Sequence, residues 1–413
     1  MSERTHLPAW QALEAHAATM TPIHLRELFA SDPQRFATLS LRHGDWLLDF
    51  SKQRLTTETL SLLRNLAAAC NWREWLERMR AGEAINHTEQ RAVSHTTLRA
   101  GAEAPADVQA SLARMADFCE RIHSGSWRGH TGERITDVVN LGIGGSDLGP
   151  RMATQALAAY QQADLRVHFV ANLDAADLAG TLSRLNPRTT LFIVASKTFT
   201  TLETLRNARS ARDWLLSTLG DASAVSKHFI ATSSNLAAAA QFGIPEGNVF
   251  SFADSVGGRF SVWSPVGLSL ALAVGFKHFS QFLAGARAMD EHFFSTPDAG
   301  NLPLTLALLA VWNTNFLGTT SRGVFPYSHS LAQLPAYLQQ LEMESNGKSV
   351  DRHGQTLDYA SNPIVWGSAG SNCQHSFFQL LHQGRMRLSC GFVSLARADF
   401  NIPSHNESML ANI

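Results

Sequence analysis

The spacing of apolar residues changes along the chain, and its first part has the spacing of helices. In residues 1–125 apolar positions recur every three or four residues, as Leu60, Leu63 and Ala67 do within TLSLLRNLAAAC. Glycines are few in this part, and no strand-like run is longer than a few residues. We therefore expect residues 1–125 to form a helical region that packs on a larger lobe.

From about residue 136, short β-branched runs alternate with amphipathic stretches. The runs predict strands at Asp137–Leu141, Val167–Ala171, Leu191–Ala195, Phe229–Thr232 and Val249–Phe252. Helices are predicted between them, including residues 174–185 and 200–218. Apolar runs of four or five residues separated by helices are typical of parallel strands buried on both faces. Right-handed crossovers then place helices on both sides of one sheet, in an α/β sandwich.

A second α/β region follows a helical segment. Residues 264–316 predict two or three helices, and a further helix is expected near residues 330–342. Strands are expected near Pro363–Gly367 and Leu388–Ser394, with a helix from about residue 374 between them. The fold class is thus α/β, with two three-layer αβα lobes whose sheets are rich in parallel strands. The expected division is an N-terminal helical region at 1–125, a small lobe at 126–275 and a large lobe at 276–413.

Composition narrows the kind of protein. Of the 413 residues 45% are hydrophobic, and 34 Lys+Arg against 35 Asp+Glu give a net charge of −1, so no basic excess can hold nucleic acid or an anionic membrane. Four separate cysteines without a CxxC pair argue against a disulfide framework or a zinc site. No apolar stretch reaches the ~20 residues of a membrane span, and MSERTHLPAW lacks a signal-peptide core. A cytoplasmic protein is expected.

A glycine-rich segment, Gly142–Gly149 (GIGGSDLG), follows the first predicted strand and opens a helix. Glycines let a ligand approach the backbone closely, and amides at a helix N-terminus bind anions. A dinucleotide fingerprint would need glycine at position 147, which is Asp147. A phosphate or sugar-phosphate loop is therefore favoured over an NAD site, although a plain βα turn without a ligand would give the same glycines.

A second loop, Ser196–Thr201 (SKTFTT), also follows a strand and precedes a helix. Its hydroxyls and the ammonium of Lys197 are the donors that a phosphate dianion needs beside free helix amides. The competing interpretation is a capping box formed by Thr200 and Glu203. Capping accounts for one hydroxyl but not for the lysine, and both interpretations are compatible.

Two later segments carry candidates for charge stabilisation and proton transfer. In Val256–Ser261 (VGGRFS) two glycines precede Arg259, whose guanidinium could stabilise negative charge on a reacting carbon, or could simply lie on a flexible surface turn. In Met343–Ser349 (MESNGKS) the GKS triplet is no P-loop, because the position of the first glycine is Glu342. What remains is Glu344, a carboxylate that could abstract a proton α to a carbonyl.

His375 is the last candidate, in the segment Cys373–Ser376 before SFFQLLHQG. We expect it to open a helix, where the helix dipole favours a neutral imidazole suited to proton transfer. A structural hydrogen bond at a helix start would explain the residue equally well. A metal site is not expected, because His382 lies seven residues away and no third ligand is evident.

Taken together, these segments resemble the phosphoglucose isomerase family. The resemblance extends from the N-terminal helices through Asn86–Val93 (NHTEQRAV) to about His405. It is dense at DVVNLGIGGSDLGP, VASKTFTTLET, VGGRFSVWSPVG, MESNGK and QHSFFQLLHQG, which occur in the family's order. It implies two lobes of the sugar-isomerase type, in agreement with the strand and helix pattern.

The resemblance also implies a role for each candidate residue. Arg259 would stabilise an enediolate-like intermediate, Glu344 would move a proton between C1 and C2, and His375 would assist ring opening from the partner subunit of a homodimer. Contacts to the sugar phosphate are implied for Gly145, Ser146, Ser196, Lys197, Thr198, Thr201 and Gln340. The reaction would interconvert glucose 6-phosphate and fructose 6-phosphate in glycolysis and gluconeogenesis, with no metal or organic cofactor, no nucleic acid and no membrane.

The sequence departs from the family mainly at its end. Family members continue further and carry a lysine in a QWGVELGK-like motif, which none of the five lysines here matches, so we expect the large lobe to be C-terminally incomplete. Leu341 and Glu342 stand where the family usually has a glycine and a small polar residue, and Cys373 replaces a glycine. Two alternatives stay open: a sugar-phosphate-binding remnant with little catalysis, and an NAD-dependent oxidoreductase that Asp147 disfavours.

Overall fold

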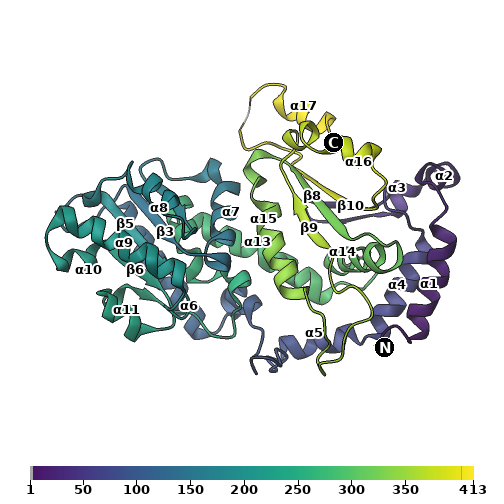
Figure 1. The fold of residues 1–413 in the computed structure, drawn as a ribbon, viewed down its shortest axis with the longest axis horizontal. Coiled ribbons are helices and arrows are strands. Elements are labelled where there is room, and N and C mark those ends of the chain that lie inside the picture. The colour runs from purple at the N-terminus through teal and green to yellow at the C-terminus, as the bar shows by residue number, and fades with distance from the viewer. Residues whose placement is uncertain (1–2, 401) are drawn as a thin grey trace.

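The computed structural model describes residues 3–400 and 402–413, and it shows two α/β bodies side by side (Figure 1). The first, drawn in blue to teal, is built around a five-stranded sheet. The second contains a three-stranded sheet, and the purple N-terminal helices lie along its outer side. This confirms the α/β fold class with two parallel sheets. The division at residues 125 and 275 stays a prediction.

The first sheet is wholly parallel, with strand order β4-β3-β5-β6-β7. Its strands confirm the sequence prediction to within a few residues: β3 (Asp137–Leu141), β4 (Arg166–Val170), β5 (Thr190–Ala195), β6 (Phe229–Thr232) and β7 (Val249–Phe250). Every residue of β3, β5 and β6 is buried. Burial on both faces explains why these strands appear in the sequence as continuous apolar runs rather than as alternating ones.

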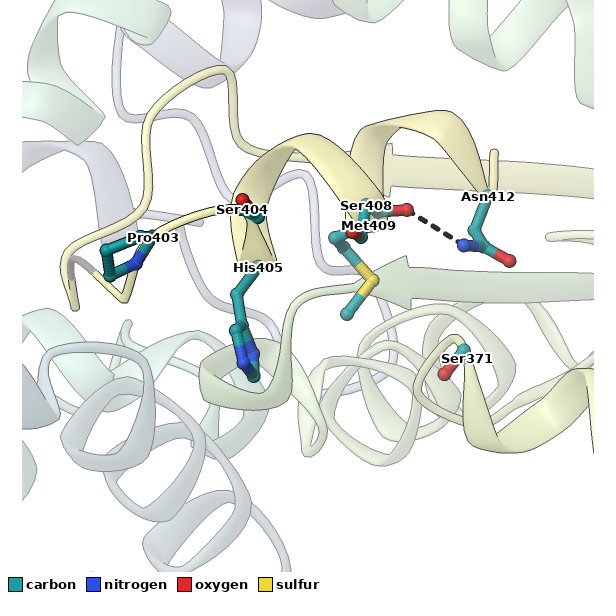
Figure 2. Close-up of a pocket in the computed structure, with 7 residues that line it drawn as sticks. All are labelled: Ser371, Pro403, Ser404, His405, Ser408, Met409 and Asn412. Carbon is teal, nitrogen blue, oxygen red and sulfur yellow. Dashed lines mark hydrogen bonds between the residues drawn. The ribbon is translucent and has the colours of Figure 1, made fainter.

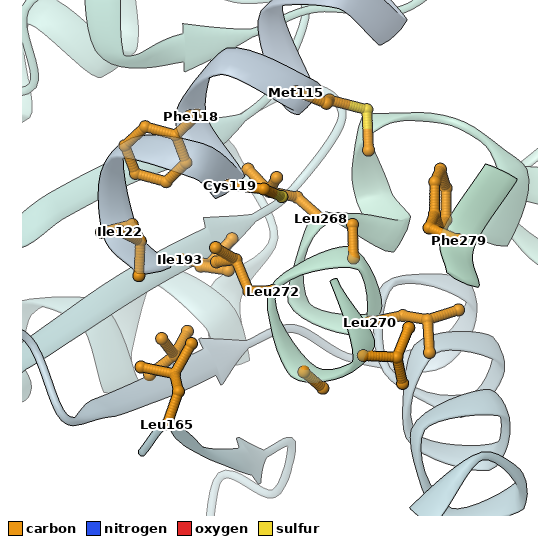
Figure 3. Close-up of a cluster of buried hydrophobic side chains, with 14 of the residues drawn as sticks. Met115, Phe118, Cys119, Ile122, Leu165, Ile193, Leu268, Leu270, Leu272 and Phe279 are labelled. Carbon is orange, nitrogen blue, oxygen red and sulfur yellow. The ribbon is translucent and has the colours of Figure 1, made fainter. Parts of the chain in front are cut away.

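Alternate side chains of this sheet enter two separate cores. Val138 and Ile193 point to one core, whereas Val139 and Phe192 point to the other. Figure 3 shows the first, where Phe118 and Leu272 come from helices packed on the sheet. That core takes side chains from α6 (Ala106–His123), α7 (Leu148–Ala156), α12 (Leu268–Val274) and α13 (Phe276–Ser295). The second takes them from α8 (Ala175–Leu182), α9 (Leu202–Leu219), α10 (Val225–His228) and α11 (Leu236–Phe242).

The second sheet is also parallel, in the order β10-β8-β9. Its edge strands, β9 (Ile364–Gly367) and β10 (Ser389–Ser394), confirm the prediction. The central strand β8 (Ser321–Tyr327) was not predicted, because Gly323 and Pro326 interrupt its apolar run as turn residues would. The helices of this part are α14 (Leu302–Val311), α15 (Leu334–Leu338), α16 (Phe378–Gln383) and α17 (His405–Ala411).

The N-terminal residues share a core with α14 and the turn after it. Trp312 is fully buried there with Leu13 and Leu63, and its indole Nε1 donates a hydrogen bond to the Arg54 carbonyl at 2.9 Å. The helices are α1 (Pro8–Met20), α2 (Leu25–Ser31), α3 (Arg35–Thr38), α4 (Thr57–Ala69) and α5 (Trp72–Arg80). A short antiparallel hairpin of β1 (Ser40–His43) and β2 (Trp46–Asp49) interrupts them. The region that we expected to be helical therefore contains a hairpin, whose four-residue strands are too short to be recognised in the sequence.

Candidate active site

The glycine-rich loop begins directly after β3 and contains a 3-10 turn at Gly144–Ser146 before α7 starts at Leu148. It lies directly against the Arg259 segment. A Cβ added to Gly145 would lie 2.2 Å from both the carbonyl carbon and the oxygen of Gly258, so only glycine fits at this position. On the sheet side, the Asn140 amide donates to the Ser146 carbonyl at 3.0 Å and fixes the turn.

Asp147, which argued against a dinucleotide fingerprint, has a structural role. It is buried and pairs with Arg151 one helical turn later, at 2.9 Å from Nη2 to Oδ1. Burial raises the pKa of the Asp147 carboxyl, and the ion pair with Arg151 offsets that rise only in part. The carboxylate therefore belongs to the start of α7 rather than to a ligand site.

The hydroxyl-rich loop follows β5, and its turn is held by neighbouring segments. The side chains of Ser233 and Ser234 both donate to the Lys197 carbonyl at 2.9 Å, and the Asn235 amide donates to the Thr198 carbonyl at 3.0 Å. Within the loop, the Ser196 and Thr201 hydroxyls lie 3.1 Å apart. Four of the predicted phosphate ligands thus lie on one well-braced turn.

The predicted capping box is not formed. The N-cap of α9 is Thr201, and its side chain makes no capping hydrogen bond within the described residues. The Thr200 hydroxyl pairs instead with the Thr198 hydroxyl at 2.6 Å, and both residues are exposed. Since capping does not occupy these hydroxyls, they and the first amides of α9 are available to an anion.

Lys197 joins this loop to the segment that precedes Arg259. Its ammonium donates to the carbonyls of Asp254 at 2.7 Å and Val256 at 3.3 Å, and lies 3.4 Å from the Asp254 carboxylate. The side chain is only 23% exposed. Asp254 was not predicted from the sequence, although its place between the end of β7 and the Gly257-Gly258 pair was a usable signal.

Arg259 and Glu344 meet although they lie far apart in the sequence. The guanidinium Nη1 lies 3.5 Å from Glu344 Oε1, and Nε donates to the Ser345 hydroxyl. Arg259 is 25% exposed and Glu344 54%, so the carboxylate is open to solvent on the side away from its partner. Glu344 ends a π-helical turn, Gln339–Glu344, that continues α15. π-Turns inside helices are frequent at functional sites.

Two other residues of this π-turn, Gln340 and Glu342, point to different surroundings. Gln340 Nε2 lies 3.0 Å from the point where a Cβ of Gly144 would be, and the buried Gln340 Oε1 has no hydrogen-bond partner in the described part of the chain. Glu342 pairs with Arg322 of β8, away from Glu344. Burial raises the pKa of Glu342, and Arg322 offsets that rise only in part. The structure thus brings Gly145, Arg259, Gln340 and Glu344 together.

His375 is not part of this group. It is exposed at the end of a 3-10 turn, Asn372–His375, and α16 begins only at Phe378, so His375 does not open a helix as expected. Among residues 3–400 and 402–413, no hydrogen bond or ion pair joins His375 to Arg259 or Glu344. Its neighbour Gln374 donates to the Tyr327 hydroxyl at 2.7 Å and thereby anchors the turn.

A pocket near this turn is separate from the Arg259–Glu344 pair. Figure 2 shows it between Ser371 and α17, with Ser404, His405 and Asn412 on its wall. Its volume is about 480 Å³. No charged carboxylate or guanidinium lines it. This composition lacks the carboxylate and the guanidinium that the other site provides.

Fold and site together define a class of protein, an α/β isomerase of sugar phosphates with two parallel-sheet lobes. The model of the family described as phosphoglucose isomerase matches residues 49–413. A glucose-6-phosphate isomerase of Dechloromonas aromatica (strain RCB) is 62% identical over 405 residues, which are 98% of this chain and 77% of that protein. The chain therefore belongs to the phosphoglucose isomerase family.

Solved structures give the same placement. The crystal structure of a glucose-6-phosphate isomerase from Chlamydia trachomatis superposes with a TM-score of 0.88 at 32% identity, covering all of this chain and 81% of that one. A hypothetical protein from Thermus thermophilus gives a TM-score of 0.56 at 29% identity, over 72% of this chain and 69% of that one. None of the described helices combines the length and apolarity needed to cross a membrane.

Proposed function

We propose that this chain interconverts glucose 6-phosphate and fructose 6-phosphate through an enediol intermediate. The observation that carries the proposal is the Arg259–Glu344 pair, with 3.5 Å between Nη1 and Oε1. A carboxylate next to a fixed guanidinium offers a base for a proton α to a carbonyl and a cation for the oxygen that becomes negative. The 62% identical glucose-6-phosphate isomerase supports this choice of reaction.

The phosphate would bind at the hydroxyl-rich loop. Ser196, Lys197, Thr198 and Thr201 supply hydroxyl and ammonium donors, and the start of α9 adds backbone amides. Lys197 already contacts the segment before Arg259, so a phosphate held here lies on the same framework as the reacting groups. Gly145, Ser146 and Gln340 are proposed to contact the sugar. Gly145 and Ser146 lie on the glycine-rich loop, and Gly145 packs against the Arg259 segment. Gln340 lies against Gly144 of the same loop.

The proton transfer balances with this chain's own groups. From the open-chain aldose, Glu344 takes the proton on C2, and the electron pair of that C–H bond moves toward the carbonyl oxygen on C1. Arg259 stabilises the resulting negative charge, which is stronger in the transition state than in the bound sugar. Return of the same proton to C1, with transfer of the C2 hydroxyl proton to the negatively charged C1 oxygen, gives the ketose. The ring must open first, and His375 is proposed as the acid–base group for that step.

We propose that a second copy of the chain supplies His375. The residue is exposed and makes no contact with the Arg259–Glu344 pair within the described chain, which a histidine that serves a neighbouring subunit would also show. The homodimer and the cytoplasmic location expected from the sequence remain predictions. The comparisons offer no support for a binding remnant without catalysis.

The test is turnover of fructose 6-phosphate by the purified 413-residue chain, measured as glucose 6-phosphate formed. We expect multiple turnovers without added metal or nicotinamide. A folded chain that binds the sugar phosphate without turnover would overturn the isomerase proposal and favour the binding remnant. Hydride transfer to a nicotinamide would favour the oxidoreductase instead.

A further inference from the structure

One segment of the N-terminal region runs along the Arg259 segment and contacts it at Asp254, Ser255, Phe260 and Trp263. We call Arg91–Arg99 the strap and Asp254–Trp263 the Arg259 loop. Arg91 Nη1 donates to the Asp254 carbonyl at 3.3 Å, and the Ser94 amide donates to the Ser255 carbonyl at 3.2 Å. The Ser94 and Ser255 hydroxyls lie 2.6 Å apart. The strap belongs to the block that begins NHTEQRAV, to which the proposed reaction assigns no role.

The contacts continue along the loop beyond Arg259. The His95 imidazole stacks on the Phe260 ring with 4.8 Å between centroids and 29° between planes. The Arg99 guanidinium carbon lies 4.1 Å from the centroid of Trp263. The Arg259 guanidinium carbon itself lies 5.2 Å from the Phe260 ring, so His95 and Arg259 both pack on one aromatic side chain.

The strap is anchored to the body of the protein by a buried ion pair. Arg99 Nε and Nη2 donate to the two carboxylate oxygens of Asp290 on α13, at 2.5 and 2.7 Å. The side chains are only 8% and 17% exposed. A bidentate pair between a guanidinium and a carboxylate fixes orientation as well as distance. The strap therefore has little freedom to move with the loop and can hold it in place.

The imidazole of His95 is uncharged and can therefore pack close to the guanidinium of Arg99 without repulsion. Burial, and then the nearby Arg99, lower the pKa of His95 to about 4, with Asp290 acting in the opposite direction. Its buried Nδ1 has no hydrogen-bond partner among the described residues. A protonated ring here would repel Arg99 and lose the hydration it needs. The residue thus contributes a neutral, flat surface against Phe260.

We propose that the strap is the positioning element of the Arg259 loop, with His95 as the positioning residue for Arg259. The strap acts at both ends of the loop. Ser94 holds the end whose carbonyls bind Lys197, and His95 holds the end that carries Arg259. The inference rests on the proposed function, because it assigns Arg259 a part in the isomerase reaction.

The experiment compares substitutions at the two ends by steady-state kinetics with fructose 6-phosphate. His95→Leu removes the ring that stacks on Phe260, and we expect kcat to fall about 10- to 100-fold while KM changes less than about threefold, since Arg259 acts on charge formed in the transition state. His95→Phe keeps a neutral ring and should restore most of kcat. Ser255→Ala loosens the Lys197 end and should raise KM several-fold with a smaller effect on kcat.

The matched control is His278→Leu. His278 is another half-buried histidine packed on an aromatic ring, Tyr160, with 5.0 Å between centroids. It lies on α13 about 18 Å along the helix from Asp290, the residue that anchors the strap. We expect wild-type kcat and KM for this variant. Combining His95→Leu with Arg259→Lys adds a second readout, because a residue that acts through Arg259 should cost much less once the guanidinium is gone.

The outcomes separate the two proposals. If the wild-type chain shows no turnover, the proposed function fails. If it turns over and Arg259→Lys is impaired while His95→Leu keeps normal kcat, the function stands and the strap inference fails. Equal losses for His95→Leu and His95→Phe, or full additivity with Arg259→Lys, would also overturn the inference. Should His95→Leu not fold, the KM effect of Ser255→Ala and the kcat of His95→Phe still decide it.

Discussion

At the residue scale, two glutamates on one π-turn have opposite surroundings. Glu344 is more than half exposed beside Arg259, whereas Glu342 is mostly buried against Arg322. The residues were visible in the sequence, but their environments were not, because the π-turn sets which side chain points to which lobe. A carboxylate that remains accessible next to a cation can exchange protons with a substrate. One fixed by a buried pair cannot do so without leaving an unpaired charge.

This difference predicts contrasting effects of two isosteric substitutions. Glu344→Gln should lower kcat by about 10²–10⁴-fold, the usual contribution of a general base, with sugar-phosphate binding nearly unchanged. Glu342→Gln should keep kcat within a few-fold and lower the free energy of unfolding by about 1–3 kcal/mol, because Arg322 loses its charged partner. Steady-state kinetics and urea unfolding of both variants provide the measurement. Normal turnover by Glu344→Gln would show that another group is the base.

At the element scale, a helix or strand could be predicted where its burial shows in its own pattern of apolar residues. The central strands β3, β5 and β6 of the first sheet are buried on both faces, so their apolar runs located them to within a few residues. β8 is just as central to its sheet, yet Gly323 and Pro326 gave it the composition of a turn. That the loops after these strands are sites of chemistry stays a prediction. Their mutual contacts, such as Gly145 against Gly258, arise from packing between distant segments and left no local signal.

That contact predicts a large effect for one added methyl group. Gly145→Ala would place its Cβ 2.2 Å from backbone atoms of Gly258, which no flexible side chain can relieve, so the two loops must separate. We expect a loss of about 1–3 kcal/mol in the free energy of unfolding and a strong fall in kcat. The control is Gly180→Ala on α8, where no described atom outside the immediate chain lies within 4 Å of the new Cβ. There we expect about 0.5–1 kcal/mol of added stability and unchanged activity. Similar results for the two variants would show that the Gly145 contact does not constrain the site.

At the scale of the whole molecule, three histidines in different parts of the fold make its stability depend on pH. His95 lies beside the Arg259 loop, His228 is fully buried beneath the first sheet, and His292 lies on α13 against the N-terminal region. Burial is the main cause of the lowered pKa of each histidine, and a neighbouring positively charged group lowers it further. The pKa of His95 is lowered to about 4. The Thr190 carbonyl, which pairs with His228 Nδ1 at 2.7 Å, only partly restores the pKa of that residue.

The sign of the pH dependence follows directly. Between the unfolded value near 6.5 and the lowered folded values, the unfolded chain binds protons that the folded chain refuses, so the contribution of these histidines to stability falls as the pH drops below about 6.5. For His95 alone the loss at pH 5 is on the order of 1–2 kcal/mol. The carboxylate of Asp137 does not contribute in this range: burial raises its pKa, but hydrogen bonds from His168, Arg166 and Thr136 outweigh that effect and hold the pKa well below its usual value. The raised pKa values of Asp147 and Glu342 act with the opposite sign, because these carboxyls bind a proton more readily in the folded chain.

Urea unfolding at pH 7 and pH 5 measures this directly, with His95→Phe as the diagnostic variant. We expect the wild-type chain to lose stability over this interval and the variant to lose less, because a phenyl ring keeps the contact with Phe260 but takes up no proton. A variant with the same pH dependence as the wild type would show that His95 is not held neutral by its surroundings. Because the folded chain keeps His95 neutral down to a pKa of about 4, His95→Phe should not change how kcat varies between pH 7 and pH 5.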